Sequence, residues 1–138
     1  MDKNEAMLRD FLPVFKKSGE NTIRFEAITD AKLIHAQRVA RSQIGALQLA
    51  LERGFRNVLI LEDDVLWRVS PNRNNLLLLQ NLVTKPYDVI MFGGTAVTAT
   101  KDHRVLYAQT ASSYLINGKY IENLIGNFQE ALELMTHR

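Results

Sequence analysis

The sequence predicts an α/β fold with a mostly parallel sheet flanked by helices. Residues 58–61 (VLIL) form an apolar run without a polar break, and residues 87–92 (YDVIMF) form a second one. Such runs are typical of strands that are covered on both faces, as in parallel sheets. Segments with helical spacing of apolar residues precede and separate the two runs. This alternation of helix and strand is the pattern of α/β proteins.

The first half of the chain contains three further predicted elements before the second buried strand. Residues 5–17 resemble a short helix, and residues 22–28 alternate like a short strand. The next helix is predicted from Asp30, its cap, to residue 53, with Gly54 as its stop. One apolar stripe runs along this helix, formed by Ala36, Ala40, Ile44, Leu47 and Leu51.

The second half begins with a helix that Ser70-Pro71 opens and Lys85-Pro86 ends. After the strand at 87–92, residues 95–103 are expected to form a mobile loop. Residues 105–108 and 113–116 are predicted to pair as strands, and Asn117 to cap a final amphipathic helix.

Length and composition exclude several classes of protein. The 138 residues fit one domain, 1–138, and 46% of them are apolar, which is enough for a real core. The net charge of +2 and the scattered basic residues argue against a nucleic-acid partner. There is no cysteine, no apolar run near the ~20 residues of a membrane span, and no signal-peptide core. We therefore expect a cytoplasmic protein.

Three carboxylates follow the first buried strand directly: Glu62, Asp63 and Asp64. In an extended backbone Glu62 and Asp64 share one face. Two carboxylates ~5 Å apart repel by roughly 3 kcal/mol at an effective dielectric of about 20. This cost needs an offset from water, from a basic side chain or from a cation. Mg²⁺ and Mn²⁺ prefer oxygen ligands and fit this need. A solvated, inert acidic turn is the equally open alternative.

Two other places carry candidate site residues. Gly93-Gly94, after the second strand, allows either a positive φ or a close approach of a ligand to the backbone, although an ordinary turn explains the pair equally well. Asp102 and His103 are the residues of the predicted loop that are able to accept a proton.

Several segments together resemble glycosyltransferase family 25, the lipooligosaccharide and collagen galactosyltransferase family. The segments are Ser42-Gln43-Ile44, Ala50-Leu51, Gly54 and residues 58–65, with residues 24–28 (RFEAI) before them and 110–117 (TASSYLIN) after them. The resemblance covers roughly residues 5 to 130. It implies a partial GT-A (Rossmann-like) fold and the transfer of galactose or glucose from a UDP-sugar to a hydroxyl of a glycan or protein acceptor.

The resemblance also implies roles for individual residues. Glu62-Asp63-Asp64 corresponds to the family's DXD-like motif, with Asp64 and Glu62 as ligands of Mn²⁺ or Mg²⁺ and with Glu62 and Asp63 beside the nucleotide. Gly93-Gly94 and the 95–103 loop would lie near the sugar or acceptor. Asp102 and His103 match no motif of the family and are candidates for the base only as the loop residues that are able to accept a proton. Gln43 stands where the family has a histidine beside its serine.

The chain matches the family only from the helix after its first strand and ends before its acceptor-side segments, so the resemblance implies a shortened domain. A sheet that lacks one strand has an unpaired edge, which favours a homo-oligomer.

Two other classes of function compete with the transferase, and the second of them is strongly disfavoured. One is a non-catalytic glycosyltransferase-like module for assembly or binding, without a complete nucleotide pocket. The other is a nucleotide triphosphatase, because its Walker B element is also an apolar strand that ends in acids. That reading needs a G-x-x-x-x-G-K-[S/T] loop, which this sequence lacks. A phosphorelay receiver is disfavoured because its acidic pair belongs on the first strand.

Overall fold

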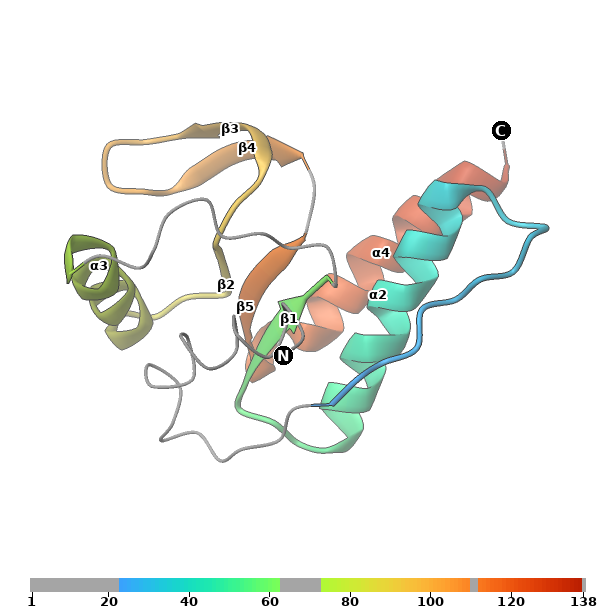
Figure 1. The fold of residues 1–138 in the computed structure, drawn as a ribbon, viewed down its shortest axis with the longest axis horizontal. Coiled ribbons are helices and arrows are strands. Elements are labelled where there is room, and N and C mark those ends of the chain that lie inside the picture. The colour runs from blue at the N-terminus through green and yellow to red at the C-terminus, as the bar shows by residue number, and fades with distance from the viewer. Residues whose placement is uncertain (1–22, 63–72, 110–111, 138) are drawn as a thin grey trace, which may run out of the picture. The chain divides into compact units, whose positions relative to one another are not determined.

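The computed structural model describes residues 23–62, 73–109 and 112–137 (Figure 1). The predicted helix at 5–17 and the predicted helix start at Ser70-Pro71 lie outside these residues. The elements are α2 (His35–Glu52), β1 (Asn57–Leu61), α3 (Arg73–Thr84), β2 (Val89–Met91), β3 (Thr95–Ala99), β4 (Val105–Gln109), β5 (Ser113–Asn117), the short 3-10 helix η1 (Gly118–Tyr120) and α4 (Ile121–Thr136).

Among the described residues the main sheet has three strands in the order β1-β5-β2, and β2 pairs with β5 antiparallel. Two backbone hydrogen bonds flank the β1–β5 pair. Gly118 N–H donates to Arg56 O (2.7 Å) at one end, and Glu62 N–H donates to Ser112 O (2.8 Å) at the other. This pattern makes β1 and β5 antiparallel as well. The predicted mostly parallel, GT-A-like sheet is therefore wrong, because β5 lies between β1 and β2 and runs against both.

The two apolar runs on which the prediction rested contain most of β1 and β2, and neither run indicates that β5 lies between them. Residues 113–116 are all buried, which reflects the central position of the strand in its sheet. A central antiparallel strand and a parallel strand both produce an unbroken apolar run, so the run alone does not reveal direction. The predicted pairing of residues 105–108 with 113–116 is also wrong.

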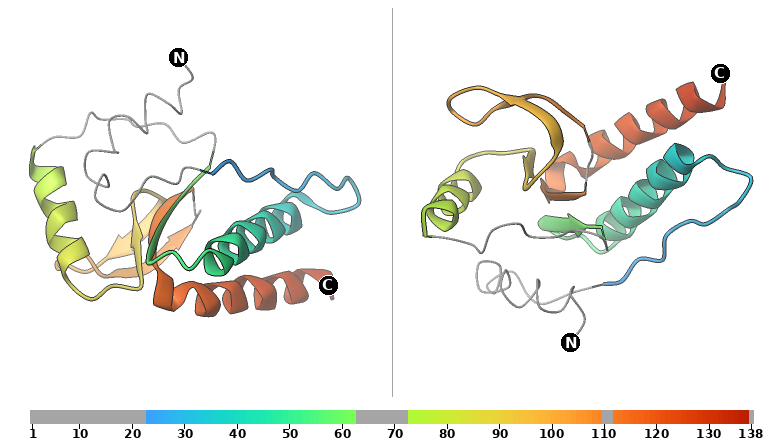
Figure 2. Two further views of the ribbon diagram at one scale, coloured as in Figure 1. Left: turned by 90° about the horizontal axis from the view of Figure 1, so that it is seen from below. Right: turned by 45° about the horizontal axis from the view of Figure 1, so that its top comes forward.

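Strands β3 and β4 form a separate two-stranded sheet, the β3–β4 hairpin (residues 95–109; Figure 2). Thr100 N–H donates to Arg104 O (2.9 Å) and closes the turn. His103 has φ 67°, in the left-handed region that a three-residue hairpin turn requires of its last residue. The prediction of a mobile loop at 95–103 is therefore wrong for residues 95–99, which form β3.

Helices α2 and α4 pack side by side, as both figures show. Their buried residues are Ala40, Gln43, Leu47 and Ala50 on α2, and Ile121 and Ile125 on α4. The predicted stripe on α2 is correct at Ala40 and Leu47, but its ends, Ala36 and Leu51, are exposed. The helix ends as predicted, since Gly54 follows it with φ 66°.

Residues 23–28, the described part of the strand predicted at 22–28, form no strand, so the prediction is wrong for these residues. Ile28 N–H donates to the Ser42 hydroxyl (2.9 Å) and attaches the segment to the helix. The Phe25 ring lies where a Cβ on Gly45 would be. Asp30 caps a turn through Lys32 N–H (3.0 Å), and α2 begins five residues later.

The chain divides into two compact units. Among the described residues, one unit comprises 59–62, 73–109 and 112–116, and the other comprises 23–58 and 117–137. None of the described helices combines the length and apolar character needed to cross a membrane.

Candidate ligand site at the strand ends

The carboxyl ends of β1 and β2 lie at the same edge of the main sheet, on either side of β5. Glu62, just after β1, donates its N–H to Ser112 O (2.8 Å), and Phe92, just after β2, donates its N–H to Ser113 O (3.1 Å). Both strands thus end beside the start of β5. We call Glu62, Phe92, Gly93, Ser112 and Ser113 the strand-end site. Because β5 separates the two strands, their ends lie about 10 Å apart, twice the usual spacing between strands.

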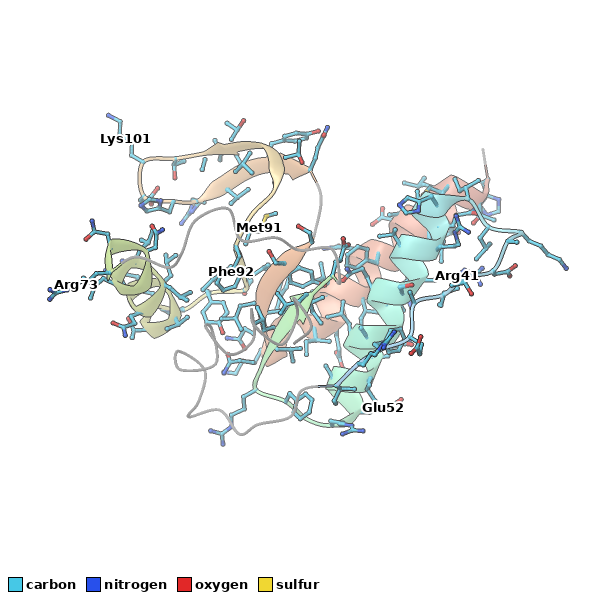
Figure 3. The ribbon with its side chains drawn as sticks, in the orientation of Figure 1. Arg41, Glu52, Arg73, Met91, Phe92 and Lys101 are labelled. Atoms are coloured by element: carbon cyan, nitrogen blue, oxygen red, sulfur yellow. The ribbon has the colours of Figure 1, made fainter. Side chains whose placement is uncertain are left out.

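Met91 and Phe92 mark the β2 side of the strand-end site in Figure 3. Met91 on β2 lies opposite Tyr114 on β5. The Tyr114 side chain is 3% exposed, and this burial raises the pKa of its hydroxyl well above its ordinary value near 10. The negative charge of Glu62 raises that pKa further. The phenol therefore stays neutral and keeps its proton beside the first carboxylate of the acidic run.

The acidic run is only partly described. Asp63 and Asp64 lie outside the described residues, and among the described ones no three histidine, cysteine or acidic side chains gather as a metal site. Glu62 is half-buried and supplies the oxygen donor that hard divalent cations prefer. The carboxylate of Glu62, the one described residue of the acidic run, is therefore chemically suited to bind Mg²⁺ or Mn²⁺.

The two candidate glycines differ in their surroundings. A Cβ on Gly94 would lie 3.1 Å from Gln109 O and 3.1 Å from Val97 Cγ2, so a side chain here would press on the base of the hairpin and these neighbours would have to move by a few tenths of an ångström. A Cβ on Gly93 would have nothing within 4 Å, and the residue is exposed. Gly93 is therefore the member of the pair whose backbone a ligand can approach.

The proposed bases lie at the other end of the β3–β4 hairpin. Asp102 and His103 are in its turn, and five-residue strands put about 16 Å between the turn and the base of the hairpin. The Asp102 carboxylate accepts a hydrogen bond from the Thr100 hydroxyl, and this bond is the main cause of its lowered pKa. A lowered pKa makes Asp102 a weaker proton acceptor. The structure thus brings Glu62 and Gly93 together at one edge, but not the two base candidates.

The remaining motif residues have structural contacts. The Ser42 hydroxyl accepts the Ile28 N–H, and Gln43, at the histidine position of the resembled family, is buried on α2. Sequence reasoning missed Ser112 and Ser113 at the strand-end site. The sequence around these serines contained little indication of this position, because only the antiparallel placement of β5 brings its amino end between the carboxyl ends of β1 and β2.

Comparison with protein-family models, with curated proteins and with solved structures finds no significant match for this chain.

Proposed function

We propose that this protein is a metal-dependent hexosyltransferase, which moves galactose or glucose from a UDP-sugar to a hydroxyl of a glycan or protein acceptor. The observation that carries the proposal is the position of Glu62. The acidic run begins at the carboxyl end of β1, beside the start of β5 and at the edge where β2 ends in Gly93. Open α/β sheets bind ligands at the carboxyl ends of their strands. The likeness here is limited to β1 and β2, which run in the same direction and end at the same edge.

In this proposal Asp64 and Glu62 would hold the divalent cation, and Glu62 or Asp63 would contact the nucleotide ribose. Gly93 gives the diphosphate or sugar room to approach the backbone, across the gap of about 10 Å between the ends of β1 and β2. A bound Mn²⁺ or Mg²⁺ supplies positive charge to the diphosphate leaving group. Tyr114 keeps a neutral hydroxyl near Glu62. Asp102 and His103 stay as predictions for the base.

Isothermal calorimetry with UDP and Mn²⁺, together and apart, tests the proposal. We expect UDP binding that requires Mn²⁺ and that Asp64→Ala abolishes. Asp88→Ala is the matched control, because Asp88 is an exposed carboxylate just before the amino end of β2, and it should bind UDP like the wild type. Absence of binding at millimolar UDP with Mn²⁺, or equal binding by Asp64→Ala, would overturn the proposal in favour of a non-catalytic module.

A pair of glycine variants separates the binding role from the structural one. Gly93→Ala has free space, so it should keep wild-type stability and weaken binding of UDP-galactose or UDP-glucose about tenfold or more. In Gly94→Ala the added methyl group would press on Gln109 O and on Val97, so this variant should have a lower melting temperature. Unchanged binding of both donors to a folded Gly93→Ala would remove Gly93 from the site.

A further inference from the structure

The sequence contains one asparagine–glycine pair, Asn117-Gly118, at the end of β5. Such a pair is prone to deamidation, because glycine has no side chain that keeps its backbone nitrogen away from the asparagine side chain. The glycine nitrogen bonds to the side-chain Cγ of the asparagine and closes a succinimide ring. The side-chain amino group leaves as ammonia with the proton of the glycine N–H. Water then opens the ring to aspartate, or to isoaspartate, in which the main chain runs through the former side chain.

The fold holds both reacting groups of this pair in other contacts. Gly118 N–H donates to Arg56 O (2.7 Å) at the end of the β1–β5 pair. The side-chain oxygen of Asn117 accepts the Lys119 N–H (3.1 Å) and caps η1. This is the usual contact of an asparagine side chain with the backbone two residues further along the chain. Ring closure therefore requires that the hydrogen bond between Gly118 and Arg56 breaks first.

The backbone also keeps Asn117 away from the geometry of ring closure. Its ψ angle of 132° is that of an extended residue. The ring closes only when rotation about this bond brings the Gly118 nitrogen onto the side-chain Cγ. Gly118 has no room for this movement, because a Cβ on it would overlap the carbonyl oxygen of Phe55 and lie 2.9 Å from that of Arg56. These are backbone atoms, so they move only when the strand end opens.

We propose that Asn117 is a deamidation site that the fold protects and that opening of the Gly118–Arg56 contact exposes. The two products have different consequences. Aspartate keeps the length of the backbone and the cap, since aspartate and asparagine are similarly good caps. Isoaspartate adds one carbon, about 1.5 Å, to the main chain, so the cap and the bond to Arg56 no longer fit together. This inference does not depend on the proposed transfer activity.

Peptide mapping by mass spectrometry, after incubation at mildly alkaline pH, tests the site and its protection. In guanidinium chloride that unfolds the chain, Asn117 should gain one dalton at least about tenfold faster than in the folded chain. Asn117→Gln should abolish this rapid change in both states. Equal rates in the folded and unfolded chain would overturn the protection. An intact Asn117 in the unfolded chain would overturn the site itself.

Two leucine variants test the gating by opening. Leu47 is fully buried on α2, and Leu47→Ala should increase the open population and raise the deamidation rate about tenfold or more. Leu134→Ala is the matched control, because it removes the same atoms from a side chain that is 64% exposed, and it should leave the rate unchanged. Hydrogen exchange at the Gly118 amide should change by the same factor as the rate. A wild-type rate in Leu47→Ala, or a rate that does not follow this exchange, would overturn the gating.

Separation of the two products by ion exchange tests their consequences. Asn117→Asp is identical to the aspartate product and should unfold at the same urea concentration as the wild type. The isoaspartate product should unfold at a lower urea concentration and exchange the Gly118 amide faster, because the strand end stays open. Equal unfolding midpoints for the two products would overturn the role assigned to the Gly118–Arg56 contact.

Discussion

Gly118 shows how much one residue without a side chain determines. Its N–H donates to Arg56 O (2.7 Å) at the end of the β1–β5 pair. A Cβ at this position would overlap the carbonyl oxygen of Phe55 and come within 2.9 Å of that of Arg56. These neighbours are backbone atoms and cannot rotate away, so only glycine allows β5 to leave the sheet and enter η1 here.

We therefore expect Gly118→Ala to lower the free energy of unfolding by about 3 kcal/mol. Gly126→Ala is the control, since a Cβ on this α4 residue has nothing within 4 Å. It should raise the stability by up to about 1 kcal/mol through helix propensity. Urea denaturation of both variants measures the two effects. Equal stabilities would show that the strand end adjusts to a side chain.

Tyr114 makes stability depend on alkaline pH. Because its pKa in the folded state is raised above the ordinary value near 10, the unfolded chain releases this proton first as the pH rises. The stabilising contribution is thus fully present below about pH 10 and decreases above it, by up to about 1.4 kcal/mol per pH unit. Between about pH 9 and 11, the free energy of unfolding of Tyr114→Phe should decrease less than that of the wild type. Identical slopes would contradict this assignment.

At the scale of elements, the segment before α2 is not a strand but is held against that helix by specific contacts. The extended residues before α2 are attached by the Ile28–Ser42 hydrogen bond and by the Phe25 ring on Gly45. The glycine costs the helix about 1 kcal/mol relative to alanine, and the ring contact explains why the helix contains it.

A double-mutant cycle on Gly45 and Phe25 tests this contact. Gly45→Ala alone should destabilise by about 1 kcal/mol, because overlap with the ring outweighs the helix gain. In the Phe25→Ala background the same change should stabilise by about 1 kcal/mol. The expected coupling of about 2 kcal/mol is measured by urea denaturation, with hydrogen exchange at the Ile28 amide as a local readout. Additive effects would mean that the ring moves aside freely.

At the scale of the whole molecule, a small set of fully buried side chains supports the fold. The largest of these among the described residues are Leu47, Ile116 and Ile121. Domains are stable by only about 5–15 kcal/mol, so one large cavity removes a considerable part of the total.

Leu47→Ala should lower the free energy of unfolding by about 3 kcal/mol, through lost burial and the cavity that remains. Leu134→Ala removes the same atoms from an exposed position and should change it by less than about 0.5 kcal/mol. Chemical denaturation followed by circular dichroism measures both. Similar values for the two would place Leu47 outside the cooperative core.

The sequence by itself determined where most of the described elements lie and where several end. Gly54 follows the end of α2, Lys85-Pro86 follows α3, and the predicted strands at 58–61, 87–92 and 113–116 overlap β1, β2 and β5. These features are local, because caps, prolines and apolar periods act within a few residues.

Only the tertiary structure decided which strands are neighbours. β5 comes from more than fifty residues after β1, yet it lies between β1 and β2 and makes both pairings antiparallel. Burial on both faces gives the same apolar run in either direction, so the sequence pattern was compatible with a parallel sheet. The same placement brings Ser112 and Ser113 between Glu62 and Gly93 and thereby defines the strand-end site.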